Sequence, residues 1–265
     1  MYKGYFNMIK TPFSKDISET AFYMTPQFKE LQYRFQKAAK ERLLLVVTGD
    51  SGCGKTTAAR CFVSSLDSSH YIHFYISDSA LSPRNFYYEI LNQLGVRPHF
   101  YRGDAKRQMA QELSRIMSMH KTPVVTIDEA HLCDREILTE IRFLLNFKMD
   151  SYSPMGLIIL GQSELREMLR KPVYQAIAGR IELQYHLPAF DRAQTQEYIT
   201  SHLQYAGETR NLFTEEAINT IFAYSGGLAR KINRVASACL CYAPQTKKSS
   251  IDENIVSLMI ETELS

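Results

Sequence analysis

The chain has 265 residues and a formal net charge of +3, and 45% of its residues are hydrophobic and 22% charged. A chain of this length can bury a sizeable core, as one large domain with a smaller one. The composition is ordinary for a soluble globular protein. The weak positive charge permits nucleic-acid binding without favouring it, because a mixed solvated surface gives the same balance.

The first residues and the cysteines bear on cellular location. The opening MYKGYFNMIKTPF lacks the apolar core of a signal peptide, and no apolar run approaches the ~20 residues that a bilayer requires. The spacing of the five cysteines suggests neither a disulfide framework nor a zinc site. Reduced thiols are the simplest interpretation, so we expect a cytoplasmic protein with no membrane partner.

Helical and strand patterns alternate from residue 25 to residue 187. Thr25 and Pro26 begin a helix that extends to residue 42 and places Phe28, Leu31 and Phe35 on one face. Strands are predicted at 43–48, 71–77, 123–131, 155–162 and 181–187. Further helices are predicted at 55–66, 83–95, 105–119 and 134–147. This alternation predicts an α/β fold in which a mostly parallel sheet has helices on both faces.

The pattern becomes entirely helical after Pro188. Asp191 caps a helix with Gln194 three residues later, in the manner of a capping box. Thr214 caps a second helix, and helical patterns follow at 228–241 and 251–263. We therefore expect an α/β domain at 1–187, including an N-terminal segment at 1–42, and a small helical domain at 188–265.

A glycine-rich loop follows the first strand. The run Gly49-x4-Gly54-Lys55-Thr56 matches the phosphate-binding pattern G-x-x-x-x-G-K-[ST] and lies between a strand and a helix. Glycines let the backbone wrap a phosphate, and the N–H groups of the following helix point toward it. Lys55 is expected to reach the β- and γ-phosphates of ATP, and the Thr56 hydroxyl to bind Mg²⁺. A plain glycine turn is the alternative. The full predicted nucleotide-binding segment is Gly49, Asp50, Ser51, Gly52, Cys53, Gly54, Lys55, Thr56 and Thr57, the last of which is also typical of an ordinary first helical turn.

An apolar strand delivers two adjacent acids, Asp128 and Glu129, to its carboxyl end. Ligands bind at this end of the strands in α/β sheets. We expect Asp128 to hold Mg²⁺ through a water and Glu129 to polarise the attacking water. His131 completes the run DEAH, where a catalytic role and a polar start to the next helix are equally good interpretations.

Three further polar residues are candidates for catalysis. Gln162 ends the fourth strand, where it either positions the lytic water or belongs to a turn that caps the next helix. Arg180 precedes the fifth strand, and Arg230 begins a helix of the second domain. An arginine can neutralise charge on a transferring phosphoryl group, although ordinary surface arginines are equally consistent with the spacing.

Seven segments, in this order along nearly the whole chain, resemble those of AAA+ ATPases of the ExeA-type group. They are KTPFSKDI, VTGDSGCGKTT, TIDEAHL, LIILGQSELREMLR, GRIELQYHLPAF, LFTEEAI and SGGLARKINR. The resemblance implies that Gln162 takes the sensor 1 position and that Arg230 takes the sensor 2 position on a helical lid. It also implies that Arg180 is an arginine finger that reaches a neighbouring subunit's nucleotide. Pro12 and Phe13 would then lie near the adenine, with core packing as the alternative.

The biological role is open to several interpretations at this point. Secretion members of the ExeA-type group carry a transmembrane segment and a wall-binding domain after the ATPase, and this sequence ends at Ser265. We therefore expect a closer resemblance to the transposition regulators of mobile elements, of the TniB, TnsC and IstB kind. These assemble with ATP as homo-oligomers on duplex DNA and present the target to a transposase. Alternatives are a secretion-associated ATPase, a nucleotide switch that binds protein, and a clamp or helicase loader.

A basic stretch after the second strand is the candidate DNA surface. Arg97, Arg102, Lys106 and Arg107 cluster there, with His99, Phe100 and Tyr101 among them. Such cations are needed for phosphate contacts, and the resemblance to ring-forming ATPases implies that this region lines a central channel. A solvated basic loop is the alternative.

Overall fold

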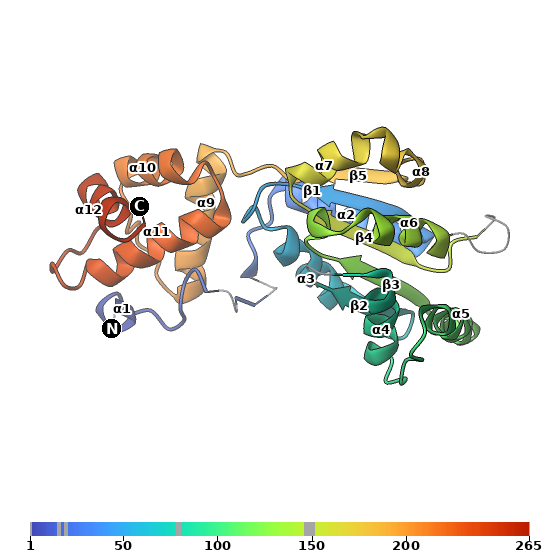
Figure 1. Cartoon of the computed structure of the whole chain (residues 1–265). Coiled ribbons are helices and arrows are strands. Elements are labelled where there is room, and N and C mark those ends of the chain that lie inside the picture. Colours follow the sequence, from blue (N-terminus) through green and yellow to red (C-terminus); the bar gives the residue numbers. More distant parts are fainter. Residues whose placement is uncertain (1, 15–16, 19–20, 78–80, 146–151, 265) are drawn as a thin grey trace. The chain divides into compact units, whose positions relative to one another are not determined.

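The computed structural model describes the chain except for residues 1, 15–16, 19–20, 78–80, 146–151 and 265 (Figure 1). The chain forms two compact units. One contains residues 28–49 and 55–187, and the other contains residues 1–27, 50–54 and 188–265. Residues 1–27 of the N-terminal segment expected at 1–42, and residues 50–54 of the glycine loop, thus group with the helical unit, although the sequence assigned them to the α/β domain.

The α/β unit is built on a five-stranded sheet in the order β2-β3-β4-β1-β5. All neighbouring strands are parallel, which confirms the predicted fold class. The strands are β1 (Leu44–Thr48), β2 (Tyr71–Ile76), β3 (Thr122–Ile127), β4 (Gly156–Gly161) and β5 (Leu183–His186). Because the strands are parallel, the carboxyl ends of β1, β2 and β3 lie at the same edge of the sheet.

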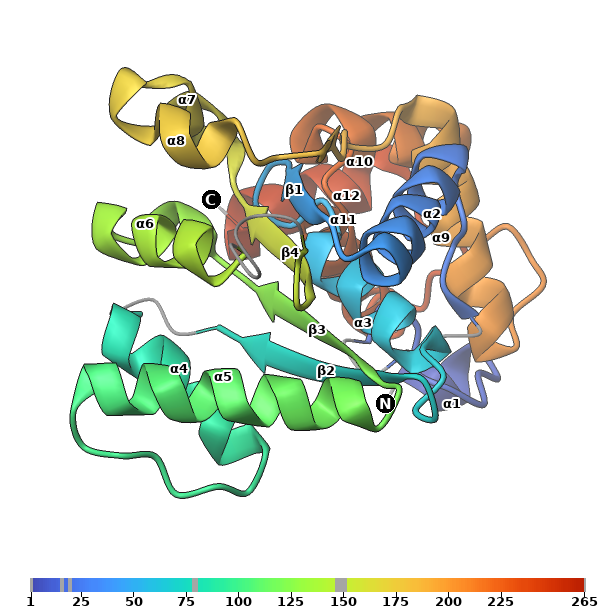
Figure 2. The same cartoon turned by 90° about the vertical axis from the view of Figure 1, so that its right-hand side faces the viewer.

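Helices cover both faces of this sheet, as Figure 2 shows. On one side, α2 (Pro26–Glu41) and α3 (Lys55–Ser65) pack together through the stacked rings of Phe35 and Phe62, whose centroids lie 5.2 Å apart. The opposite side carries α4 (Pro83–Gln93), α5 (Arg102–Ser118), α6 (Arg135–Leu144), α7 (Ser163–Arg170) and α8 (Gln175–Ala178). Alternate strand residues such as Leu44 and Val46 join the core under these helices, as the two-residue period of a strand requires.

The helical unit contains α9 (Arg192–Ala206), α10 (Glu215–Ser225), α11 (Ala229–Tyr242) and α12 (Glu253–Met259), followed by a helical turn at Ile260–Leu264. Asp191 and Gln194 form the expected capping box at the start of α9. Before these helices in the chain, α1 (Tyr2–Tyr5) leads into Phe6, Met8 and Phe13, which belong to the same core. These three residues near the start of the chain are therefore part of this unit's hydrophobic interior.

Several element bounds differ from the sequence expectation. Helix α5 begins at Arg102, three residues before the predicted start at 105. The loop between α4 and α5 is therefore shorter than predicted. Strand β3 ends at Ile127 and is followed by a 3₁₀ turn, η2 (Ala130–Leu132). Glu129 has a left-handed backbone (φ 51°), which ends the extended conformation before the run DEAH is complete. The last part of the helix predicted at 134–147, and Lys15–Asp16 of the KTPFSKDI segment, lie outside the described residues.

A short 3₁₀ turn, η3 (Pro172–Tyr174), joins α7 to α8. Among the helices that the structure describes, none combines the length and the apolarity needed to cross a membrane.

Candidate nucleotide-binding site

The carboxylate of Asp128 is the centre of the candidate site in the α/β unit. Asp128 follows β3 and is only 4% exposed. Its Oδ2 accepts hydrogen bonds from Thr56 Oγ1 at 2.7 Å and from Tyr75 Oη at 2.8 Å, and its Oδ1 accepts one from the Glu129 N–H at 2.8 Å. The two residues predicted to share Mg²⁺, Thr56 and Asp128, are thus in direct contact. Their hydroxyl and carboxylate oxygens are the hard donors that Mg²⁺ prefers, so the donor set fits this ion.

Tyr75 is a member of this cluster that sequence reasoning missed. Burial raises the pKa of its hydroxyl, and the hydrogen bond to Asp128 raises it further, so the hydroxyl stays protonated and donates at neutral pH. Phe74 and Ile76, on either side of it, point into the core, and Tyr75 therefore points to the other face of β2. The sequence did contain a signal for this role, because Tyr75 is a polar residue near the end of β2, the strand that pairs with β3.

Lys55 begins α3 and is 7% exposed. Its Nζ donates to the carbonyl oxygen of Gly49 at 2.7 Å, which joins the two ends of the phosphate loop. Between them, Gly52 and Gly54 have φ values of +85° and +108°, which L-residues rarely adopt. Glycine at these two positions is therefore a requirement of the backbone.

Arg230 contacts the phosphate loop within the helical unit. Its N–H donates to the Gly52 carbonyl at 3.2 Å, and its Nη1 donates to Ser51 Oγ at 3.0 Å. A Cβ atom at position 52 would lie 2.7 Å from the Cβ of Arg230, so any side chain at Gly52 would displace the arginine. Of the loop's other residues, Cys53 donates its N–H to the Asp50 carbonyl at 3.2 Å, which closes a turn.

Glu129, His131 and Gln162 lie close together in the α/β unit. The Glu129 carboxylate is 45% exposed, and its Oε2 lies 3.5 Å from His131 Nδ1. The backbone N–H of Gln162 points to the same His131 nitrogen at 3.4 Å. Gln162 is the N-cap residue of α7, but its side chain makes no capping hydrogen bond. The amide side chain at the end of β4 is therefore not used to cap the helix.

The last three predicted site residues are Arg180, Pro12 and Phe13. Arg180 lies between α8 and β5 and is half-buried. Pro12 and Phe13 are buried. The ring of Phe13 stacks on His202 at 5.0 Å, and its N–H donates to His202 Nδ1 at 3.1 Å. Burial lowers the pKa of His202 to about 4, so the ring is neutral and accepts this bond. Phe13 thus packs in the core of the helical unit, and its expected place near the adenine stays a prediction.

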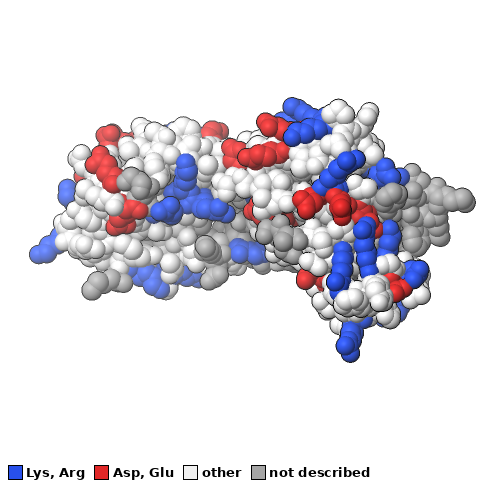
Figure 3. Space-filling model, viewed as in Figure 1, with Lys and Arg blue, Asp and Glu red and all other residues white. Residues whose placement is uncertain are grey.

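The candidate DNA surface is more neutralised than its sequence indicates. In Figure 3, Lys and Arg side chains gather over α4 and α5, with Asp and Glu beside them. The buried carboxylate of Glu140 forms ion pairs with Arg102 and Lys106 and accepts from the Tyr87 hydroxyl. Burial raises the pKa of Glu140, but the hydrogen bonds from these groups outweigh it and lower the pKa overall. Arg107 pairs with Asp104.

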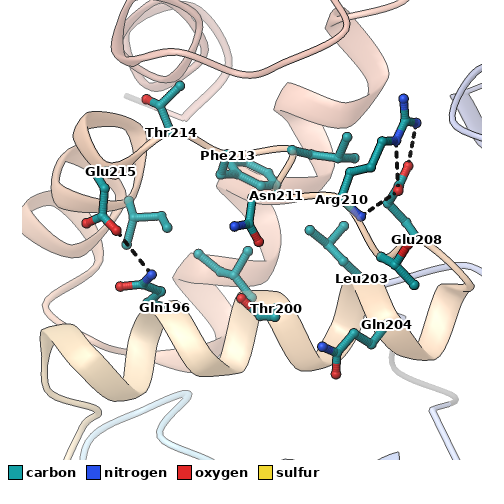
Figure 4. Close-up of a pocket in the computed structure, with 14 residues that line it drawn as sticks. Gln196, Thr200, Leu203, Gln204, Glu208, Arg210, Asn211, Phe213, Thr214 and Glu215 are labelled. Carbon is teal, nitrogen blue, oxygen red and sulfur yellow. Dashed lines mark hydrogen bonds and ion pairs between the residues drawn. The ribbon is translucent and has the colours of Figure 1, made fainter.

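The helical unit has a cavity of its own, of about 250 Å³, between α9, residues 208–214 and the start of α10 (Figure 4). At its edge Arg210 binds the Glu208 carboxylate at 2.6 Å, and the Gln196 amide donates to Glu215 at 3.2 Å. Dashed lines in Figure 4 mark both interactions. None of the predicted site residues is among the described residues that line it. This cavity is therefore separate from the candidate nucleotide site.

Comparison with known proteins places this geometry in a family. The AAA domain family matches residues 37–169. General secretion pathway protein A of Aeromonas hydrophila is 30% identical over 252 residues, which are 92% of this chain and 45% of that protein. The chain spans about half the length of the curated relatives it matches.

Solved structures agree with this placement. The Aeropyrum pernix ORC2 protein, in ADPNP and ADP complexes, has a TM-score of 0.69 at 17% identity, over 96% of this chain and 71% of that one. The Aeropyrum pernix ORC1 protein in complex with DNA has a TM-score of 0.68 at 15% identity, over 93% of this chain and 67% of that one. At such identities the likeness shows the fold alone. The family match and the parallel sheet with its phosphate loop show that the chain belongs to the AAA domain family, as an AAA+ ATPase related to the general secretion pathway protein.

Proposed function

We propose that this protein binds ATP with Mg²⁺ and hydrolyses it to ADP and phosphate. The observation that carries the proposal is the direct contact between Thr56 and Asp128, at the edge of the sheet where the phosphate loop begins. These two residues would hold Mg²⁺, which when bound neutralises phosphate charge. Lys55 supplies a second positive charge next to the loop backbone.

Glu129 has the properties of a general base for the attacking water. Its carboxylate is 45% exposed, so a water molecule has access to it, and its left-handed backbone fixes where the side chain leaves the chain. Gln162 would orient that water, and Arg230, in contact with Ser51 and Gly52, would respond to the nucleotide that the loop binds. The positioned base contributes roughly a hundredfold or more to such a reaction.

We further propose that the protein assembles as a ring or helical filament in which Arg180 completes a neighbouring subunit's site. The arginine precedes β5, outside the cluster around Asp128. A positive charge supplied by a neighbour would make hydrolysis depend on assembly. The family resemblance and the position of Arg180 before the last strand support this proposal.

The assembled protein is proposed to bind duplex DNA through the α4–α5 region. A structure of similar fold is described in complex with DNA. Arg102 and Lys106 remain 49% and 43% exposed although Glu140 binds them, so a phosphate can approach both cations from solvent. Arg97 is exposed, as are Phe100 at 69% and Tyr101 at 71%, next to these cations.

The pathway is proposed from resemblance. In the transposition-regulator alternative, the DNA-bound oligomer selects the target and recruits a transposase. The secretion-associated alternative is favoured by the similarity to General secretion pathway protein A. A nucleotide switch that binds protein instead of DNA is the third. DNA binding by the assembled protein separates the first of these from the other two.

Replacing Glu129 by Gln should keep ATP binding and reduce hydrolysis roughly a hundredfold or more, because a carboxamide cannot accept the proton. Lys55→Ala is the contrasting variant, since it should lose ATP binding itself. Binding is measured with a labelled ATP analogue, because the chain has no Trp. Wild-type turnover in Glu129→Gln would remove Glu129 from the mechanism.

Replacing Tyr75 by Phe should raise the Mg²⁺ concentration needed for half-maximal hydrolysis by about threefold to tenfold. The variant removes one of two side-chain donors to Asp128, and such a bond to a charged group contributes about 1.5 kcal/mol, less where water can replace it. Tyr71→Phe, in the same strand, is the matched control, because its hydroxyl makes no hydrogen bond with the described residues. Identical Mg²⁺ titrations for both variants would show that Tyr75 does not position Asp128.

Mixing Arg180→Ala with Lys55→Ala should restore part of the hydrolysis that each variant lacks alone. In a mixed assembly, the Lys55→Ala subunit supplies Arg180 to the intact nucleotide site of its neighbour. Specific activity of the wild type should also rise with protein concentration. If mixing restores nothing and wild-type activity is independent of concentration, the site is complete within one chain.

Duplex DNA binding should require a non-hydrolysable ATP analogue and weaken steeply with salt, because only an assembly adds up the weak contacts of its subunits. Arg97→Ala with Arg107→Ala should reduce the slope of log affinity against log salt by about one for each phosphate that is no longer neutralised. Arg115→Ala, an ion-paired cation near the end of α5, serves as the control. Fluorescence anisotropy across a salt series measures both. Absence of binding at low salt with the analogue would favour the protein-binding switch.

A further inference from the structure

A larger cavity of the α/β unit lies between α7–α8 and the strands β1 and β5. Its volume is about 610 Å³. One wall comes from α7 and α8 and the other from Thr48, Gln184 and His186, with Val46 at the floor. Figure 1 shows α7 and α8 beside β5. Its described lining residues include no member of the phosphate loop or of the Asp128 cluster, so ATP binding as proposed above leaves this cleft unassigned.

The cleft is lined by basic residues and by no acidic ones among the described residues. Arg166, Arg170 and His186 line it, and no Asp or Glu is among the described lining residues. Arg166 and Arg170 are exposed and form no ion pair or hydrogen bond with other described residues. They stand four residues apart on α7, hence on one face of the helix, ~6 Å apart along its axis. Two like charges in this arrangement repel each other, and an anionic ligand would relieve that repulsion.

The floor of the cleft is apolar. Val46 is 4% exposed, and Leu169 and Ile181 are partly buried against the main core. Ala178 and Pro172 complete the apolar lining. A ligand that fills the cleft therefore needs aliphatic side chains as well as negative charge, because apolar surface gains by being removed from water.

We propose that this cleft is a docking site for an extended segment of a partner protein in which acidic and aliphatic residues alternate. In an extended chain, side chains two residues apart lie on one side and ~6.6 Å apart, which matches the spacing of Arg166 and Arg170. The aliphatic residues between them face the apolar floor at Val46. The proposal goes beyond ATP hydrolysis and does not depend on it.

Two features of the cleft distinguish this occupant from others. A nucleic-acid backbone offers phosphates but no aliphatic groups for the floor around Val46 and Ile181. Addition of a strand to the edge of β5 is disfavoured, because the Gln184 carbonyl already accepts from Arg34 Nη1 at 2.8 Å. The contacts are therefore made by side chains, with the arginines providing specificity for acids.

The test is a titration of the full chain with a fluorescein-labelled peptide in which Glu alternates with Leu, followed by anisotropy. We expect saturable binding, and none to a twin peptide with Lys in place of Glu. The variant Arg166→Glu with Arg170→Glu should bind the acidic peptide roughly tenfold more weakly or worse, because it replaces two attractive charge pairs by two repulsive ones. Lys29→Glu with Lys40→Glu, two exposed cations of α2, is the matched control and should bind like the wild type. Lys55→Ala should also bind normally, which separates this result from failure of the ATPase proposal.

Three outcomes would overturn the proposal. The first is no saturable binding of the acidic peptide, or equal affinity in the wild type and the Arg166→Glu, Arg170→Glu variant. The second is displacement of the peptide by duplex DNA that binds more tightly and depends on the same two arginines. The third combines two results: the variant no longer assembles with ATP, as measured by sedimentation, and the peptide prevents assembly of the wild type. This last result would assign the cleft to a second copy of the chain. The milder Arg166→Ala, Arg170→Ala variant guards against a folding defect from charge reversal.

Discussion

The buried carboxylate of Asp128 is the interaction on which the proposed chemistry depends. A carboxylate that is 4% exposed gives up most of its hydration and is tolerated only where donors replace that water. Thr56, Tyr75 and the Glu129 N–H supply three such donors, from α3, β2 and the end of β3. The parallel strand order brings these elements to one edge of the sheet. The donors that stabilise the buried Asp128 carboxylate therefore also hold it next to the Thr56 hydroxyl. These two groups are the proposed ligands of Mg²⁺.

A comparison of two basic clusters shows why the number of cations in a sequence does not measure the positive charge that a surface offers. Arg102 and Lys106 share the buried carboxylate of Glu140, which lies 38 and 34 residues away along the chain. Arg166 and Arg170, which attract no notice in the sequence, have no such partner among the described residues. The first cluster must divide its N–H groups between Glu140 and any phosphate. The second is available in full.

The sequence predicted the alternation of strands and helices, the phosphate loop and the acids after β3, because these depend on local periodicity and on motifs with fixed spacing. It did not predict Tyr75, because its role depends on the pairing of β2 with β3, in which Tyr75 lies opposite Thr126. The neutralisation of Arg102 by Glu140 and the identity of His202 as the packing partner of Phe13 were not predicted, for the same reason. Each is a contact between residues far apart in the chain, and local patterns carry no record of such a partner.

Helix α7 connects two features that the sequence presents as unrelated. Gln162, directly before the helix, points its N–H at His131, which lies beside the Glu129 carboxylate. Arg166 and Arg170, farther along the same helix, line the basic cleft, and Ala178 and Ile181, on either side of Arg180, line it as well. A helix of 8 residues is short, and packed helices shift as units instead of deforming continuously. Gln162 and the two arginines of the cleft therefore belong to the two ends of one short helical segment.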